Sequence, residues 1–263
     1  MVRRKNVIAT ISPTAGFVDP KGAVIIDNLG DSIMRLHHSV CAAVLTLLAS
    51  GGVASAQDAD VSANVVVTGD YMFRGFSQTN EGPALQGSAD VTIGAFYAGA
   101  WASNVDFGDE TDAEIDLYGG FRGEASGFAY DVGVVAYVYV GDTGTTYDYV
   151  EVKVAVSRAV GPVTAGVSVY FSPDFFGVDD EATYVELNGA VIPADKWTVS
   201  GAVGEQFLNL TDDYTTWNLG VGYAITDTVG VDVRYHGTDV DEPIIHDVHI
   251  AHDRIVGTVK VLF

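Results

Sequence analysis

Hydrophobic and polar residues alternate along most of the chain after about residue 60, with the two-residue period of a strand that has two different faces. The segment 150–158 has valine at four alternate positions, and Glu151, Lys153 and Ser157 lie between them. The segment 229–236 repeats the pattern with valines opposite Asp232 and Arg234. This alternation predicts strands that are apolar on one side and polar on the other.

The alternating segments predict about twelve strands, joined by connections that are long and short in turn. The strands are expected near 64–76, 84–93, 95–104, 113–123, 128–140, 147–159, 163–171, 182–192, 197–207, 214–225, 229–238 and 254–263. The long connections are 77–83, 105–112, 141–146, 172–181, 208–213 and 239–253, and the short ones are 94, 124–127, 160–162, 193–196 and 226–228. This is typical of an all-β transmembrane barrel, antiparallel and up-and-down, with short periplasmic turns and longer outer loops.

The last predicted strand gives a separate indication of an outer-membrane barrel. Ile255, Gly257, Val259, Val261 and the terminal Phe263 lie on one face of it. A terminal aromatic on an alternating strand is typical of the signal read by the barrel-assembly machinery, which we therefore expect as a partner. The alternative is an ordinary edge strand. Backbone groups must be paired in lipid, so such strands are expected to close into a ring.

Aromatic residues near the strand ends are candidates for the two girdles at the membrane interfaces, although some of them are expected to face the lumen. They are Phe73, Phe76, Phe128, Tyr130, Phe171, Trp197, Tyr223, Tyr235 and Phe263. The pattern leaves open which way Phe96, Tyr97 and Trp101 face. No stretch after residue 57 approaches the length of apolar residues that a membrane helix needs.

Residues 34–56 have the features of a cleavable signal peptide. Arg35 precedes an apolar stretch at 40–49, and Ala-Ser-Ala at 54–56 is a small-residue cleavage site. The alternative, a membrane anchor, is disfavoured because the apolar stretch is too short to span a bilayer. We expect residues 1–33 to be a mis-called upstream extension and 57–263 to be the exported barrel.

Composition narrows the classes of function. A net charge of −22 argues against nucleic-acid binding, which needs clustered Lys and Arg. The single cysteine, Cys41, allows neither an internal disulfide nor a four-cysteine metal site. No cofactor is expected.

Charged residues fall on the polar faces of the predicted strands, where the cost of exposing charge to lipid forces them inward. The expected lumen-lining residues are Asp70, Arg74, Asp90, Glu114, Asp116, Arg122, Asp131, Glu151, Lys153, Glu186, Asp232, Arg234 and Lys260. Eight are acidic and five are basic. They predict either a water-filled lumen that favours cations or a salt-bridged network that fills a narrow barrel.

The last long connection contains His246, His249 and His252, a spacing that is a candidate for metal binding if a turn brings the side chains together. The alternative is a set of polar loop residues. Acidic outer loops are interpreted as a solvated face, with weak divalent-cation binding as the alternative. A serine hydrolase would use Ser172 or Ser103 with a base from this loop, but no G-x-S-x-G motif is present, so no enzyme is expected.

Three stretches resemble a known family. They are Tyr-Met-Phe-Arg-Gly-Phe-Ser-Gln-Thr at 71–79 with Pro-Ala-Leu-Gln-Gly at 83–87, the block at 94–105, and Glu-Ile-Asp-Leu-Tyr-Gly-Gly at 114–120. They resemble the TorF-type porin family of proteobacteria, over roughly 64–140. The resemblance implies an outer-membrane location and a barrel, leaves porin activity as an expectation, and transfers no catalytic residue.

The sequence therefore predicts a passive outer-membrane porin of a Gram-negative bacterium, embedded in outer-membrane lipid, through which small ions or solutes diffuse with a weak preference for cations. The alternatives are a narrow, non-conducting structural or surface-binding barrel and a soluble secreted β protein.

Overall fold

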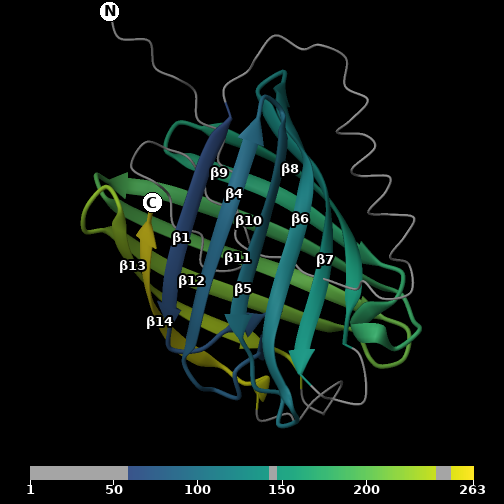
Figure 1. Ribbon diagram of the computed structural model, residues 1–263. Helices are drawn as coiled ribbons and strands as arrows, with labels where there is room; N and C mark the ends of the chain where they lie inside the picture. Colours follow the sequence, from purple (N-terminus) through teal and green to yellow (C-terminus); the bar gives the residue numbers. More distant parts are fainter. Residues whose placement is uncertain (1–58, 142–146, 241–249) are drawn as a thin grey trace, which may run out of the picture.

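Twelve antiparallel strands close into one barrel in the computed structural model, which describes residues 59–141, 147–240 and 250–263 (Figure 1). The barrel strands are β1 (Asp60–Thr68), β4 (Ala84–Ile93), β5 (Phe96–Asn104), β6 (Thr111–Ala125), β7 (Phe128–Gly141), β8 (Tyr149–Val160), β9 (Val163–Ser172), β10 (Ala182–Ala194), β11 (Trp197–Leu208), β12 (Tyr214–Ala224), β13 (Val229–Thr238) and β14 (Arg254–Leu262). Each pairs with the next along the chain, so the predicted up-and-down topology is confirmed.

The ring closes between the first and the last strand. Val65 in β1 pairs with Val261 in β14, and the Phe263 N–H donates to the Ala63 carbonyl at 2.9 Å. Closure leaves none of the described barrel strands with an unpaired edge, which a sheet in lipid requires because no water is present to bond the backbone.

The connections sort to the two ends of the barrel by length, as predicted. The end with the short connections, called here the turn end, is where β1 begins and β14 finishes (Figure 1). The other end, called the loop end, contains the inward hairpin described below, whose short strands are β2 (Met72–Phe73) and β3 (Phe76–Ser77), and the 3-10 helix η1 (Phe175–Gly177). Among the described residues no helix is long and apolar enough to cross a membrane. The predicted upstream extension and signal peptide, 1–33 and 34–56, lie outside the described residues.

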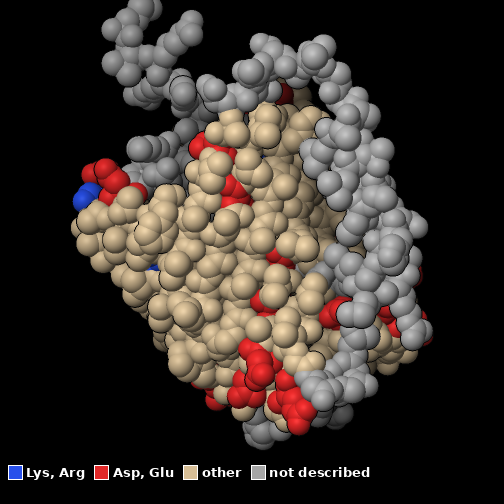
Figure 2. Space-filling model, in the orientation of Figure 1, with Lys and Arg blue, Asp and Glu red and all other residues tan. Residues whose placement is uncertain are grey.

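The two faces of the wall differ sharply in chemistry. In β8, Val152 is 44% exposed on the outside, whereas Glu151 is 1% exposed on the inside. Many large hydrophobic side chains, such as Leu85, Leu187 and Val233, are exposed on the outer face of the strands. The front view of the surface is mostly uncharged, with acidic residues near the loop end and further charged residues toward the turn end (Figure 2). An apolar outer band with a polar interior is what a transmembrane barrel needs.

Most of the expected girdle aromatics face outward, but two do not. Phe128, Phe171, Trp197, Tyr235 and Phe263 are exposed, and so is Phe96. Phe73, Phe76 and Trp101 are buried inside the barrel, and the half-buried Tyr97 also faces inward, where its hydroxyl donates to Asp131. Phe73 and Phe76 are therefore among the candidates that face the lumen, because their segment leaves the wall.

The prediction of one continuous strand at 64–76 was wrong for its second half. β1 ends at Thr68, and residues 69–83 turn into the barrel as an inward hairpin. Arg74 (φ 43°) and Gly75 (φ 91°) have left-handed backbone conformations that no extended strand accepts. A Cβ at Gly75 would lie 3.0 Å from Thr238 Cβ, so the turn needs glycine both for its φ and for its space.

Candidate functional site

The inward hairpin fills the loop end of the barrel interior. All residues from 70 to 79 are buried, and they contact inward-facing side chains from β5 to β14. Met72 pairs with Ser77 and Phe73 with Phe76, which makes a minimal two-stranded hairpin. The interior at this level is therefore occupied by the chain's own backbone.

The base of the hairpin is fixed to the wall through Asp70. One of its carboxylate oxygens accepts hydrogen bonds from Ser77 Oγ (2.6 Å) and Thr79 Oγ1 (3.0 Å). The other pairs with Arg254 of β14, which also contacts Glu81 at 3.0 Å. These bonds join both strands of the hairpin to one point on the wall.

The tip of the hairpin is fixed to the opposite wall through Arg74. Its guanidinium makes two parallel hydrogen bonds to the Glu151 carboxylate, at 2.7 and 2.8 Å, and a third to Gln206 Oε1 at 3.1 Å. Tyr137 donates to the same carboxylate at 3.0 Å. Bidentate arginine–carboxylate pairs are among the stronger and more directional contacts in proteins.

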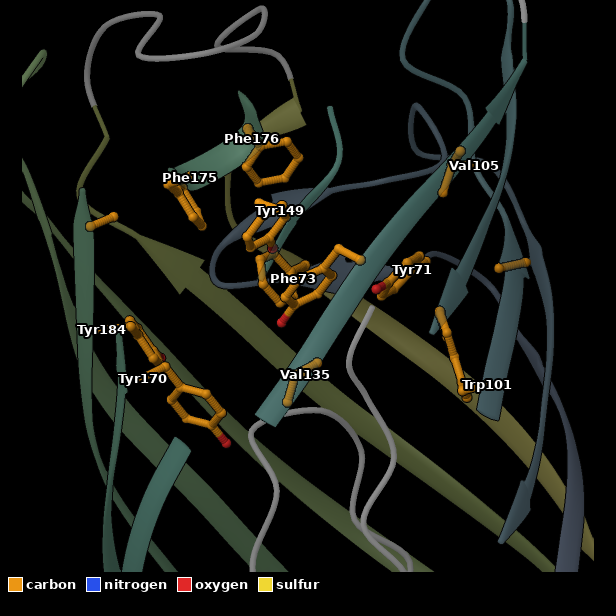
Figure 3. Close-up of a cluster of buried hydrophobic side chains, with 13 residues drawn as sticks. Tyr71, Phe73, Trp101, Val105, Val135, Tyr149, Tyr170, Phe175, Phe176 and Tyr184 are labelled. Carbon is orange, nitrogen blue, oxygen red and sulfur yellow. The ribbon is translucent and has the colours of Figure 1, made fainter. Parts of the chain in front are cut away.

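Aromatic rings enclose the same guanidinium. Arg74 Cζ lies 4.5 Å from the ring centre of Tyr184, 5.1 Å from Tyr170, 4.7 Å from Phe73 and 5.9 Å from Phe175. These distances allow cation–π attraction, which strengthens when water is excluded. Figure 3 shows Tyr170 and Tyr184 side by side on neighbouring strands, with Phe175 toward the loop end.

Further aromatic packing seals the rest of this level. Tyr71 meets Trp101 edge-on at 5.3 Å and donates to Glu114 at 3.1 Å. Burial, and then the nearby Glu114 and Asp116 carboxylates, raise the pKa of Tyr71, so its phenol keeps the proton that it donates. Phe176 of η1 stacks on Tyr149 at 4.9 Å (Figure 3).

The turn end of the interior is more open to solvent. Inward residues there, such as Ser62, Thr92 and Ser200, are half-buried, whereas Tyr149 and Gln206 at the loop end are fully buried. Solvent therefore reaches the inward side chains nearest the turn end, whereas Asp131 and Lys260, only a few residues further in, are already buried.

Glycines in the wall let large side chains lie flat at this end. A Cβ at Gly120 or Gly133 would lie 2.5 or 2.6 Å from the Tyr97 hydroxyl, so the ring lies along the wall. The guanidinium of Arg122 lies 4.1 Å above the same ring. A nearby cavity of ≈ 10 Å³ beside Asp131 has room for about one water.

All thirteen expected lumen-lining residues lie on the inside, but Asp70 and Arg74 do so from the inward hairpin and not from a strand. Asp90 and Arg122 are half-buried and the other eleven are buried. Besides Arg74–Glu151, the structure joins Asp131 to Lys153 (3.1 Å) and Asp232 to Arg234 (3.2 Å).

Sequence reasoning missed several members of this site. Arg254 falls at a predicted strand start, and Gln206 and Tyr184 have inward positions that alternation alone does not distinguish. A two-residue period identifies the face of a strand but not which inward residues meet across the barrel.

Among the described residues, the side chains expected for a metal site or a hydrolase site do not come together. His246 and His249 lie outside the described residues, and the exposed His252 contacts Glu81 at 3.3 Å. Within the described ranges, no three His, Cys, Asp or Glu side chains are placed to hold a metal ion. Metal binding by the histidine loop stays a prediction. Ser103 Oγ donates to the Asn104 carbonyl, and Ser172 Oγ accepts from the Asp174 N–H.

A closed antiparallel barrel with an apolar outer face and a charged interior defines a transmembrane β-barrel protein. The chain belongs to the family Gcw_chp, described as a bacterial protein of unknown function, whose model matches residues 53–262. That description does not contain the TorF name, so the TorF-type resemblance stays a prediction. No curated protein matches the sequence.

Solved porins have a similar fold. The KdgM porin matches with a TM-score of 0.53 and 9% identity, over 77% of this chain and 98% of its own. The same porin in complex with disordered oligogalacturonate has a TM-score of 0.51 and 8% identity, over 78% and 98% of the two chains. The NanC porin has a TM-score of 0.52 and 10% identity, over 78% and 99%. At these identities the similarity is one of fold.

Proposed function

We propose that this protein is an outer-membrane channel for small solutes with a preference for cations, and that the described conformation is its closed state. The observation that supports the proposal most is the charged interior of a barrel whose outside is apolar. A purely structural barrel gains little from so many buried charges, because each one costs desolvation energy.

The balance of interior charge favours cations. The inward-facing set contains eight acids, and with Arg254 it contains six bases. Glu186 accepts hydrogen bonds from the neutral side chains of Asn188 and Tyr184. Pores lined by an excess of carboxylates attract cations. The oligogalacturonate bound by KdgM is a polyacid, and this interior is a poor match for such a cargo.

The proposed location is the outer membrane of a Gram-negative bacterium, reached by export with cleavage of the signal peptide. In that location the turn end faces the periplasm and the loop end faces outward. Lipid is the partner of the apolar band, and the barrel-assembly machinery is the partner of the last strand, where Phe263 is exposed. The proposed activity is transport, and it assigns no catalytic residue.

A second candidate function is a non-conducting structural or surface-binding barrel. The observation that favours it is the filled loop end, where Arg74, Tyr149 and Gln206 are buried and tightly bonded. If the hairpin never moves, no solute passes.

The two candidates differ in electrical behaviour across a planar bilayer with a salt gradient. We expect protein purified from outer membranes to give infrequent discrete openings, and Glu151→Gln to give frequent ones, because it weakens the bond that holds the hairpin tip. The reversal potential is expected to favour cations. Folded protein of both forms that stays silent would support the structural barrel, and an anion-favouring potential would contradict the proposed selectivity.

A further inference from the structure

The pocket that holds the Arg74 guanidinium is built by the barrel wall and η1. Glu151 comes from β8, Tyr170 from β9, Tyr184 from β10 and Gln206 from β11. Phe73 is the one ring of the group that belongs to the hairpin itself. The rest of the pocket would therefore keep its chemistry if the hairpin moved away.

The pocket has the features of a receptor for a planar organic cation. A carboxylate offers two oxygens at one edge, an amide oxygen lies at 3.1 Å, and two tyrosine rings lie within 5.1 Å of the charge centre. A guanidinium fits this arrangement better than an ammonium, because it matches both oxygens and stacks on rings. Inorganic cations gain less from the rings because they are more strongly hydrated.

Withdrawal of Arg74 would leave Glu151 buried without its positive partner. An uncompensated buried carboxylate is costly, so the emptied pocket would favour any cation that fits. Neutral solutes of the same shape would leave that charge uncompensated.

We propose that this pocket is a binding site for solutes that contain a guanidinium or a small alkylammonium group, and that Arg74 is an intrinsic occupant that such a solute displaces. The inference rests on the proposed channel function and names its solute class. Because the same contact fixes the hairpin tip, solute binding and opening of the loop end are coupled: each requires Arg74 to leave.

The test is a calorimetric titration of methylguanidinium chloride into the full chain purified from outer membranes in detergent, with N-methylurea as the neutral counterpart. Arg74→Ala is expected to bind methylguanidinium saturably and at least tenfold more tightly than the wild type, in which Arg74 competes. Arg74→Ala/Glu151→Gln is expected to lose at least tenfold of that affinity. N-methylurea is expected not to bind.

The matched control is Arg234→Ala, which removes the partner of Asp232, another buried acid of the same interior. Absence of saturable binding by Arg74→Ala, or equal binding by Arg234→Ala, would overturn the proposal. If Arg74→Ala does not assemble, Arg74→Gln, which removes the charge and keeps a shorter hydrogen-bonding side chain, is titrated instead. Binding in a barrel that never conducts would support the pocket and contradict the channel, whereas currents without binding would contradict the pocket alone.

Discussion

Arg74 and Glu151 are 77 positions apart in the sequence and form a bidentate ion pair across the barrel interior. One residue belongs to the inward hairpin and the other to the wall. Their contact helps to fill the interior, and in the proposed channel it also closes the passage. The experiments below separate these two aspects.

Glu151→Gln is expected to destabilise the barrel. Breaking one side of a buried ion pair costs about 3–5 kcal/mol when the other charge stays buried, although an amide retains part of the hydrogen bonding. The measurement is the temperature at which the folded band is lost in a heat-modifiability gel. Glu124→Gln is the control, because Glu124 is exposed at the turn end. An equal small shift in both variants would show that the Arg74–Glu151 pair adds no stability.

The second prediction compares Gly75, in the turn of the inward hairpin, with Gly108, in the connection between β5 and β6. Both glycines have a positive φ. Gly75→Ala is expected to cost about 1–3 kcal/mol of strain and to crowd Thr238, so the hairpin loosens and channel openings become more frequent. Gly108→Ala has a similar backbone strain but meets nothing within 4 Å of the new Cβ. Single-channel recordings of both variants check this. Equal opening frequencies would indicate that the tip is not held where the structure has it.

Neutralising either of two half-buried interior residues of opposite charge is expected to shift the ion selectivity, in opposite directions. Asp90→Asn removes a negative charge and is expected to move the reversal potential toward anions, whereas Arg122→Gln is expected to move it toward cations. Bilayer recordings in a fixed salt gradient measure both. If neither variant changes the reversal potential, ions do not pass these residues.

The lipid-facing surface gives a fourth prediction. Val152→Arg places a charge on the outer face of β8 and is expected to cost about 2–4 kcal/mol if that level lies near the bilayer midplane. Val160→Arg, at the turn end of the same strand, is expected to cost about 0–1 kcal/mol. The yield of folded barrel in outer membranes compares them. Normal assembly of Val152→Arg would show that the assigned faces are inverted.

The sequence predicts the wall better than the interior, and the reason is the range of the interactions. Alternation in 150–158 predicts Val152 outside and Glu151 inside, and the structure has both. That pattern is local, and one buried face is enough to produce it. The same alternation describes β1 as far as its end at Thr68. It does not predict which inward residues contact one another across the barrel.

The inward hairpin was missed because its local pattern imitates a strand. Tyr71, Phe73 and Arg74 continue the mixture of aromatic and charged residues that the strands have, yet every one of them is buried. The partners that hold Arg74 in place, Glu151 and Gln206, are 77 and 132 positions away. A local signal was present in Gly75, because a glycine within a run of large side chains is a candidate for a turn that needs a positive φ.

The most direct test of the account is the single-channel conductance of a variant in which residues 71–79 are replaced by a short Gly-Ser linker, beside the wild type. The account predicts a barrel that stays heat-modifiable and conducts in long, discrete, cation-favouring openings, because the loop end has lost its filling. A correctly folded variant that opens no more often than the wild type would contradict the claim that the hairpin closes a solute pathway.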